Sequence, residues 1–246
     1  MNQVLLTVSG EIDPQIEAKI ARGERPEADY IAMARVFGAD LLDYTAARQR
    51  TGWLGKLLES LLGPNLILAW ACFLARSRYR VIFTDGEQIG LPLAFLLKFL
   101  APGAQVRHLM IVHILSVWKK ALLVDAFRLW RWIDIFFVYA TRQKEFILSR
   151  WPLPADRVVF TPFMVDARFF SPDRVTEKPP LDLESLSGPL ICAVGLEFRD
   201  YPTLLEAIRG VDVTLVIAAG SPWSKRADST QRQDLPENVI VRRFSQ

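Results

Sequence analysis

Residues 194–207 read VGLEFRDYPTLLEA, and an apolar run from Pro189 to Val194 leads into them. The run predicts a buried strand, Gly195 a turn, and the apolar spacing from Tyr201 to Arg209 a helix. Another apolar run, Val211 to Ala219, follows directly and predicts a second strand. Together they form a βαβ unit, in which a glycine turn lets the backbone approach a phosphate and the helix N-terminus favours an anion.

The preceding residues show the same alternation of apolar runs and helical spacing. Strands are predicted at Val4–Val8, Ala39–Asp43, Arg80–Thr84, Val106–Val112, Ile135–Tyr139 and Val158–Thr161. Helices are predicted at Glu27–Phe37, at Trp53–Ala75 with a break near Gly63-Pro64, and at Ile89–Leu100, Ser116–Trp132 and Arg142–Trp151. This pattern indicates an α/β fold with a parallel sheet covered on both faces.

Composition narrows the class of protein. The chain has 246 residues, of which 51% are hydrophobic, and a net charge of +3, so it can bury a sizeable core and is too weakly basic for a nucleic-acid partner. Cys72 and Cys192 both stand in apolar runs, which predicts two buried thiols and a reducing compartment. Residues 1–8 carry no basic leader, and no apolar run approaches the roughly 20 residues of a membrane span. We therefore expect a cytoplasmic protein, soluble or peripheral on the inner face of the membrane.

Four segments, in order, resemble glycosyltransferase family 4, whose enzymes have the GT-B fold of two Rossmann-like domains facing a cleft. They are the strand Leu109–His113, the strand and helix from Asp134 to Glu145, the stretch Val158–Asp166 continuing to Pro172, and residues 194–207. The third is similar to the family's "NGVD" stretch before the linker, and the fourth to the start of its donor-binding domain. The resemblance thus spans roughly residues 80–219.

The resemblance implies the domain organisation and the activity. Residues 1–172 would form an N-terminal Rossmann-like, acceptor-side domain, 173–188 a linker, and 189–246 part of the C-terminal donor domain. The activity would be a hexosyltransferase type of glycosyltransferase. It would move a sugar from a nucleotide-diphosphate sugar to a hydroxyl of a glycan or lipid acceptor, in polysaccharide, glycolipid or other glycoconjugate synthesis. No cofactor and no metal are implied.

Departures from the family pattern leave a second class open. Leu196 stands where a basic residue is usual, Arg199 replaces a lysine, and Phe163 and Met164 replace the asparagine and glycine of "NGVD". The family's glutamate pair, seven residues apart, would lie beyond residue 246, so we expect a fragment truncated within the donor domain. The alternative is a non-catalytic or degenerate GT-B-like binding module. A nicotinamide-dependent oxidoreductase is disfavoured because no GxGxxG fingerprint follows the first strand.

Candidate site residues lie at the ends of predicted strands. By the resemblance, His113 would contact the transferred sugar as the catalytic residue, while Gly195 and Arg199 would bind the donor phosphates. Residues of two acidic turns after strands could orient acceptor hydroxyls: Gly10, Glu11, Asp85 and Glu87.

Each of these residues also has a structural interpretation. The His113 ring could simply donate a hydrogen bond to a backbone carbonyl, and Arg199 could be a solvated charge paired with Asp200. Short acidic turns are common in proteins without any binding role. His108 faces the sheet interior or a helix by alternation and is expected to be structural.

The helix predicted at Trp118–Trp132 suggests a further partner. At helical spacing, Lys120, Val124, Phe127 and Arg131 form a stripe of basic and apolar side chains. Such a stripe can lie in a membrane interface, with its cations on anionic lipid. The alternative is a helix whose aromatic side chains enter the core while its charged ones stay in water.

Overall fold

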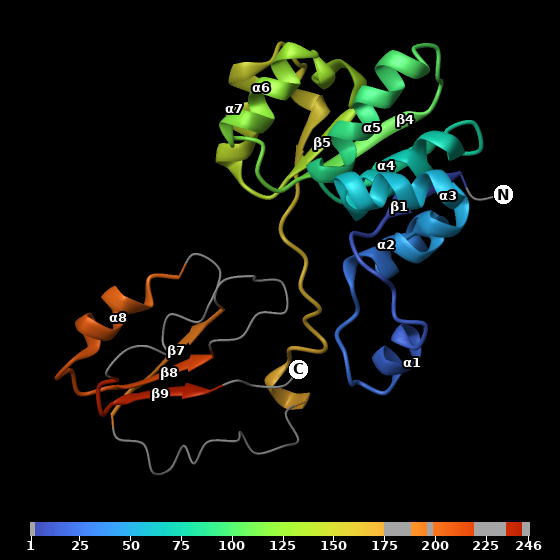
Figure 1. The fold of residues 1–246 in the computed structure, drawn as a ribbon. Coiled ribbons are helices and arrows are strands. Elements are labelled where there is room, and N and C mark those ends of the chain that lie inside the picture. The colour runs from blue at the N-terminus through green and yellow to red at the C-terminus, as the bar shows by residue number, and fades with distance from the viewer. Residues whose placement is uncertain (1–2, 175–187, 196–198, 219–234, 243–246) are drawn as a thin grey trace. The chain divides into compact units, whose positions relative to one another are not determined.

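The computed structural model describes residues 3–174, 188–195, 199–218 and 235–242. The chain divides into two compact units, Met1–Ser171 and Pro172–Gln246 (Figure 1). Each unit is an α/β structure built on a parallel sheet. No helix formed by these described residues is both long and apolar enough to cross a membrane.

The first unit is built on a six-stranded sheet in which every pairing is parallel. Its strand order is β2-β1-β3-β4-β5-β6. The strands are β1 (Val4–Thr7), β2 (Ala39–Leu42), β3 (Val81–Thr84), β4 (Arg107–Val112), β5 (Ile135–Val138) and β6 (Val158–Phe160). All six coincide with predicted strands to within a residue or two, because short runs of buried apolar residues separated by helices are typical of parallel sheets.

The helices of this unit also follow the apolar periodicity. They are α1 (Ile16–Ala21), α2 (Asp29–Phe37), α3 (Tyr44–Leu62), α4 (Pro64–Ala75), α5 (Glu87–Leu100), α6 (Trp118–Ala126) and α7 (Thr141–Arg150), with 3-10 turns at Leu129–Trp132 and Ala155–Arg157. Gly38 ends α2 in the left-handed conformation with φ 57°, as its position predicted. Gly63 separates α3 from α4, with Pro64 in the first turn of α4.

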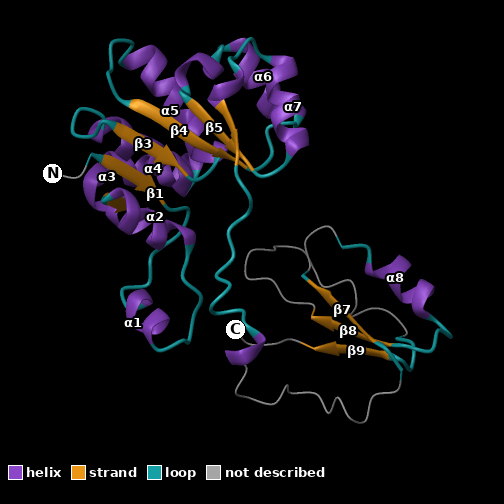
Figure 2. Ribbon diagram, turned by 180° about the vertical axis from the view of Figure 1, so that it is seen from behind, coloured by secondary structure: helices purple, strands orange, loops and turns teal. Residues whose placement is uncertain are grey.

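The two faces of the sheet are covered differently. On one face, Leu5 and Ile82 pack with α4 and α5, while Met110 and Phe136 pack with α6 and α7. Figure 2 shows strands β3, β4 and β5 with α4 and α5 behind them. On the other face, alternate residues of the same strands, including Phe83, pack with side chains of α2. Within the described part of the chain α2 is the one helix on that face. Much of this face therefore stays open, and the prediction of a sheet covered on both faces was wrong for it.

Helix α1 was not predicted from the sequence, and two other helices differ from their predicted bounds. Helix α3 begins at Tyr44, well before Trp53, because the Asp43 carboxylate caps it by accepting the Ala46 amide at 2.8 Å. Helix α6 ends at Ala126 instead of continuing to Trp132, because Arg128 adopts φ 48° and starts a 3-10 turn. The Phe127 carbonyl, freed by this break, accepts a hydrogen bond from the Lys98 ammonium at 2.6 Å.

The second unit contains a three-stranded parallel sheet in the order β7-β8-β9. Its elements are β7 (Leu190–Val194), α8 (Tyr201–Ile208), β8 (Thr214–Ala218) and β9 (Val239–Arg242), after a 3-10 turn at Pro172–Arg174. Tyr201 and Leu205 of α8 pack on Leu215 and Ile217 of β8, which makes the predicted βαβ unit.

One prediction for this unit was wrong. The strand predicted to be buried, β7, is mostly exposed, Cys192 included, whereas Cys72 in α4 is buried as expected. Cys192 lies on β7, an edge strand of the small sheet, and α8 is the one described helix that packs against this sheet. An apolar run in the sequence therefore does not bury every member of an edge strand.

Candidate functional site

The carboxyl ends of β1, β3 and β4 meet at one edge of the large sheet, and two turns are joined there. The Thr7 hydroxyl donates to Asp85 Oδ1 at 2.9 Å, and the Ser9 amide donates to Asp85 Oδ2 at 2.6 Å. In return, the Asp85 amide donates to the Thr7 hydroxyl oxygen at 3.0 Å. These bonds fix the turn after β3 against the turn after β1. This edge is where open α/β sheets bind ligands.

Asp85 itself is withdrawn from water. Burial raises the pKa of its carboxyl above the ordinary value, although the hydrogen bonds from Ser9 and Thr7 act in the opposite direction. The Asp85 carboxylate, held in this way, stabilises the turn. The backbone carbonyl of Asp85 faces the residue that follows β4, His113.

His113 is exposed directly after β4 and is fixed at three points. Its amide donates to Glu87 Oε2 at 2.9 Å, and its carbonyl accepts from the Gln143 side-chain amide at 2.6 Å. Its ring Nε2 lies 2.8 Å from the Asp85 carbonyl oxygen. Since a carbonyl can only accept, Nε2 carries a proton, which leaves Nδ1 as the acceptor of the neutral ring. Nδ1 has no hydrogen-bond partner among the described residues.

Glu87 lies beneath this histidine, with its side chain only 2% exposed. Its Oε1 accepts from the Lys120 ammonium at 2.6 Å and from the Ile114 amide at 3.0 Å. Burial would raise the pKa of this carboxyl, but Lys120 and the backbone amides outweigh it, so the pKa lies below its usual value. Both carboxylate oxygens are thus used by the protein, and Glu87 positions the loop that carries His113.

The other two acidic-turn candidates lie apart from this cluster. The Glu11 carboxylate pairs with Arg48 of α3 at 2.5 Å, and the same arginine pairs with Glu59 at 2.7 Å. The Gly10 carbonyl accepts the amide of Tyr44 at 3.0 Å. Gly10 and Glu11 therefore connect the first turn to α3, while Asp85, Glu87 and His113 are brought together.

Gly195 and Arg199 are neighbours in the second unit. Gly195 has φ 98°, a conformation that favours glycine, and Arg199 Nε donates to the Val194 carbonyl at 3.3 Å. Asp200 caps α8 by accepting the amide and hydroxyl of Thr203 at 3.2 and 2.8 Å. The guanidinium of Arg199 thus lies over the glycine turn, while the helix N-terminus already holds a carboxylate. The departure at Leu196 lies outside the described residues.

Sequence reasoning missed four residues that build this site. Thr7, Ser9 and Lys120 hold the two carboxylates, and Gln143 binds the His113 carbonyl while its Oε1 accepts the Tyr139 and Ala140 amides at 3.0 and 3.1 Å. The position of Gln143 in the first turn of α7 is a capping signal that could have been found. The partners of Lys120 and Thr7 are distant in the sequence and gave no local signal.

His108 is structural, as expected. It is buried, with Nε2 3.1 Å from the Thr84 hydroxyl and Nδ1 3.1 Å from the Trp132 carbonyl. Burial lowers its pKa to about 4, so the ring stays neutral at pH 7. The described residues hold no cluster of three or more histidine, cysteine or acidic side chains arranged for a metal ion.

The predicted stripe on the Trp118–Trp132 helix does not exist as one surface. Lys120 is paired with buried Glu87, Val124 is fully buried, and Arg131 lies beyond the end of α6. The exposed apolar side chains of α6 are instead Trp118, Leu122 and Leu123, with Trp118 and Leu122 one turn apart. The prediction failed because the periodicity could not show which stripe faces the sheet.

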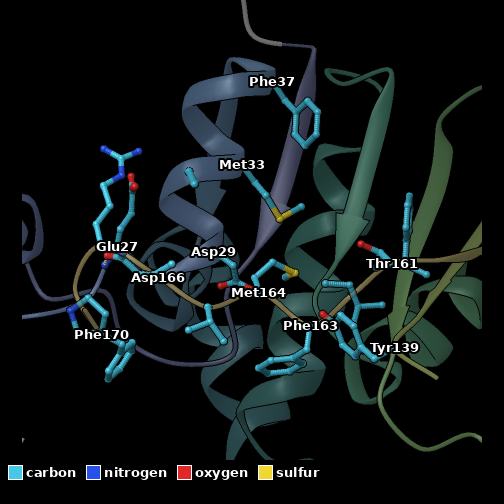
Figure 3. Close-up of a pocket in the computed structure, with 18 of the residues that line it drawn as sticks. Glu27, Asp29, Met33, Phe37, Tyr139, Thr161, Phe163, Met164, Asp166 and Phe170 are labelled. Atoms are coloured by element: carbon cyan, nitrogen blue, oxygen red, sulfur yellow. Dashed lines mark hydrogen bonds between the residues drawn. The ribbon is translucent and has the colours of Figure 1, made fainter. Parts of the chain in front are cut away.

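A pocket of about 840 Å³ opens on the sheet face that α2 covers only in part. Figure 3 shows Met33 and Phe37 projecting from α2, with Phe163 and Met164 opposite them on the segment after β6. Phe83, Ile111 and Phe137 of the sheet also line it. Tyr139, which lines the pocket as well, has its ring centroid 6.1 Å from that of His113.

Comparison with solved structures identifies the fold. HepE from Anabaena, solved in complex with UDP-glucose, is 10% identical with a TM-score of 0.57, the match covering 99% of this chain and 69% of that one. The S. aureus MnaA-UDP structure is 10% identical (TM-score 0.47, 98% and 68% covered), and the glycosyltransferase SnogD from Streptomyces nogalater is 17% identical (TM-score 0.36, 98% and 72% covered).

No family model and no curated protein sequence matches the chain. The likeness to HepE, together with the six-stranded parallel sheet and its helices, shows that the fold is α/β and GT-B-like, as predicted.

Proposed function

We propose that this protein is a glycosyltransferase that moves a sugar, of the hexosyl type, from a nucleotide-diphosphate sugar to an acceptor hydroxyl. The first unit would bind the acceptor, a glycan or lipid, and the second the donor. The GT-B-like fold supports this class, and HepE was solved with a nucleotide sugar bound. Fold alone does not define an activity, so the proposal depends on the site at His113.

The observation that carries the proposal is the fixed tautomer of His113. With Nε2–H donating to the backbone carbonyl of Asp85 at 2.8 Å, Nδ1 of the neutral ring presents a lone pair at the carboxyl edge of the sheet. A hydroxyl placed there would donate to Nδ1 and gain nucleophilicity or orientation, and the positioned imidazole would also stabilise positive charge developing on the sugar. Glu87 and Gln143 restrain the histidine backbone, which keeps the ring in place for this role.

Arg199 is our candidate for the donor phosphates. Its guanidinium lies within 3.8 Å of the position a Cβ would take on Gly195, so the charge and the open glycine turn share one surface. A guanidinium can bind a diphosphate with two parallel hydrogen bonds and stabilise it as a leaving group. We propose no metal or organic cofactor for this step.

The test is release of nucleoside diphosphate from a panel of UDP-, GDP- and ADP-sugars with glycan and alkyl-glycoside acceptors. His113→Ala should lower kcat/KM by about 10²- to 10⁴-fold, the usual contribution of a positioned acid or base. Ser149→Ala, at an exposed position of α7, is the matched control. Equal activity of the His113 variant and wild type would refute the role of this residue.

Donor binding is tested separately by calorimetry with UDP-glucose. Arg199→Ala should weaken binding at least tenfold, whereas Arg209→Ala, at the other end of α8, should not change it. Binding without turnover of any nucleotide sugar would favour the alternative, a non-catalytic GT-B-like binding module. This alternative is kept because Leu196 stands directly after Gly195, where the resembled family usually has a basic residue.

A membrane surface is the second partner that we propose. Trp118 and Leu122 are 68% and 55% exposed on α6, with Lys119 beside Trp118. This combination suits the boundary between lipid headgroups and acyl chains. Wild-type protein should float with vesicles of anionic phospholipid, whereas the Trp118→Ser and Leu122→Ser variants should not. Leu61→Ser, which changes an exposed apolar side chain of α3, is the control and should still float. Equal flotation of wild type and all variants would refute membrane binding through α6. The cytoplasmic location stays a prediction.

A further inference from the structure

The pocket between α2 and residues 161–170 has no role in the chemistry at His113. We propose that it binds the hydrocarbon part of an amphiphilic acceptor, whose hydroxyl-bearing head reaches His113. The role of this ligand as acceptor rests on the proposed function, whereas the apolar binding site is inferred from the geometry alone. At about 840 Å³, the pocket is within the range of small-molecule sites and can hold a chain well beyond a single ring.

The wall formed by residues 161–170 is held in place by one carboxylate. Asp166 Oδ2 accepts the Glu27 amide at 2.8 Å, across 139 residues of sequence. Its Oδ1 accepts the amides of Arg168 and Phe169, both at 3.1 Å. These bonds close the segment onto the residues just before α2, so the pocket exists before any ligand binds, which lowers the entropic cost of binding.

The lining is mostly apolar, which favours hydrocarbon over a sugar. The ring centroids of Phe83 and Phe137 lie 5.0 Å apart on the sheet, and Met33 and Met164 offer flexible thioethers that adapt to an irregular chain. A sugar would need several free hydrogen-bonding groups around it. The acidic groups at the rim already have partners within the protein: Glu27 pairs with Arg35, Asp29 accepts the Tyr30 amide through one oxygen, and Asp166 is bonded as described above.

The same wall carries apolar side chains that face water. Phe163, Val165 and Phe170 are 71%, 66% and 63% exposed. Exposed apolar side chains gathered around a concave surface mark a binding site, because covering them removes their area from water. An acyl or prenyl chain supplies that cover without any polar group to desolvate.

Tyr139 connects the pocket with the catalytic edge. Its ring centroid lies 5.1 Å from that of Phe163 and 6.1 Å from that of His113. A ligand that continues past this ring therefore has one end among apolar side chains and the other beside the His113 ring. This juxtaposition is what makes the expected ligand amphiphilic instead of wholly apolar.

Binding can be tested without any turnover. The neutral fluorophore N-phenyl-1-naphthylamine should bind wild type saturably with one site, and 1-decanol should displace it far better than 1-butanol. Ala32→Phe, which places a ring in the pocket, should raise the dissociation constant at least tenfold. Val36→Phe adds the same ring at a position of α2 that is 76% exposed and does not line the pocket, so it should leave binding unchanged.

Several results would overturn the proposal. Non-saturable binding, equal displacement by the two alcohols, or equal affinity of the two phenylalanine variants each excludes the site. Light scattering gives a further check: a dimer that Phe163→Ser dissociates would show that a second copy covers the pocket. The displacement by alcohols uses wild-type protein, so it tests the apolar site even if the Ala32→Phe variant fails to fold.

Turnover separates this inference from the proposed function. Using a sugar nucleotide that the enzyme consumes, decyl glucoside should be at least tenfold better in kcat/KM than methyl glucoside, and Ala32→Phe should abolish that preference. Transfer to both acceptors with equal efficiency refutes the pocket as an acceptor site and leaves the glycosyltransferase intact. Saturable probe binding with no transfer from any nucleotide sugar refutes the proposed function and leaves the apolar site intact.

Discussion

Glu87 accepts the backbone amide of His113 at 2.9 Å, so one buried carboxylate joins the start of α5 to the end of β4. The same carboxylate neutralises Lys120, which approaches from α6. Three elements that are separate in the sequence are thus tied to one side chain, and the position of His113 depends on all of them.

Replacing Glu87 with alanine should therefore reduce stability as well as disturb the site. We expect a loss of about 3 kcal/mol, because the change leaves the Lys120 charge and the amides of His113 and Ile114 without their acceptor. Urea denaturation measures it, and Glu11→Ala, whose carboxylate is 62% exposed, is the control with an expected loss below about 1 kcal/mol.

The pH dependence of this contribution has a definite sign. The folded pKa of Glu87 is lowered, so its stabilisation is complete above the unfolded pKa of about 4.3 and is lost as the pH falls from there through the lower folded value. Glu87→Gln should flatten the stability curve in that window. An unchanged curve would contradict the assigned contacts.

His108 should destabilise the protein in a different window. Burial lowers its folded pKa to about 4, while the unfolded ring titrates near its ordinary value of about 6.5. Between these values only the unfolded state takes up the proton, so stability falls by about 1.4 kcal/mol for each unit of decreasing pH. His108→Gln should remove this slope between roughly pH 6.5 and 5 in urea titrations. Parallel curves for variant and wild type would show that the ring is not buried.

Gly90 allows α5 to approach the sheet closely. A Cβ at this position would lie 2.7 Å from Met110 Cγ and 2.8 Å from Thr84 Oγ1, with Met110 Sδ closer still. Gly90→Ala should cost about 1–3 kcal/mol, since overpacking outweighs the gain in helix propensity. Gly103→Ala has nothing within 4 Å of the new Cβ and should change the thermal midpoint little. A stabilised Gly90→Ala variant would mean that α5 packs farther from β4.

The two cysteines should differ in reactivity. Burial raises the pKa of the Cys72 thiol far above its ordinary value, while Cys192 is exposed. Titration with DTNB should consume one thiol in the native protein and two in guanidinium chloride. Cys192→Ser should abolish the native reaction. Two fast thiols in the native state would be incompatible with the packing of α4.

The fold was largely readable from the sequence, because strand runs and helix periodicity are local signals. The errors lie where a distant group decides the outcome. Helix α6 stops at Ala126 without a glycine or proline, and the carbonyl freed at Phe127 is satisfied by Lys98, 29 residues away. The early start of α3 was predictable from Asp43, a common cap residue that the apolar pattern alone overlooks.

The site was predictable only as a set of positions. Strand ends placed Asp85, Glu87 and His113 at one edge, and the structure brings them together there. The sequence could not show that Asp85 and Glu87 position the site while His113 presents its ring. These roles depend on Lys120, Thr7 and Gln143, whose contacts span 30 or more residues. The turn residue Glu11 looks equivalent to Glu87 in sequence, yet Arg48 draws it toward α3.

The position of β1 between β2 and β3 has a consequence for biosynthesis. The strand made first pairs with β2 on one side and with β3 on the other, so its second row of backbone groups has no partner until residue 84 has left the ribosome. A nascent chain shorter than this exposes an unpaired edge, which is a template for aggregation. Slow translation before β3 should therefore lower the yield of soluble protein more than slow translation after it.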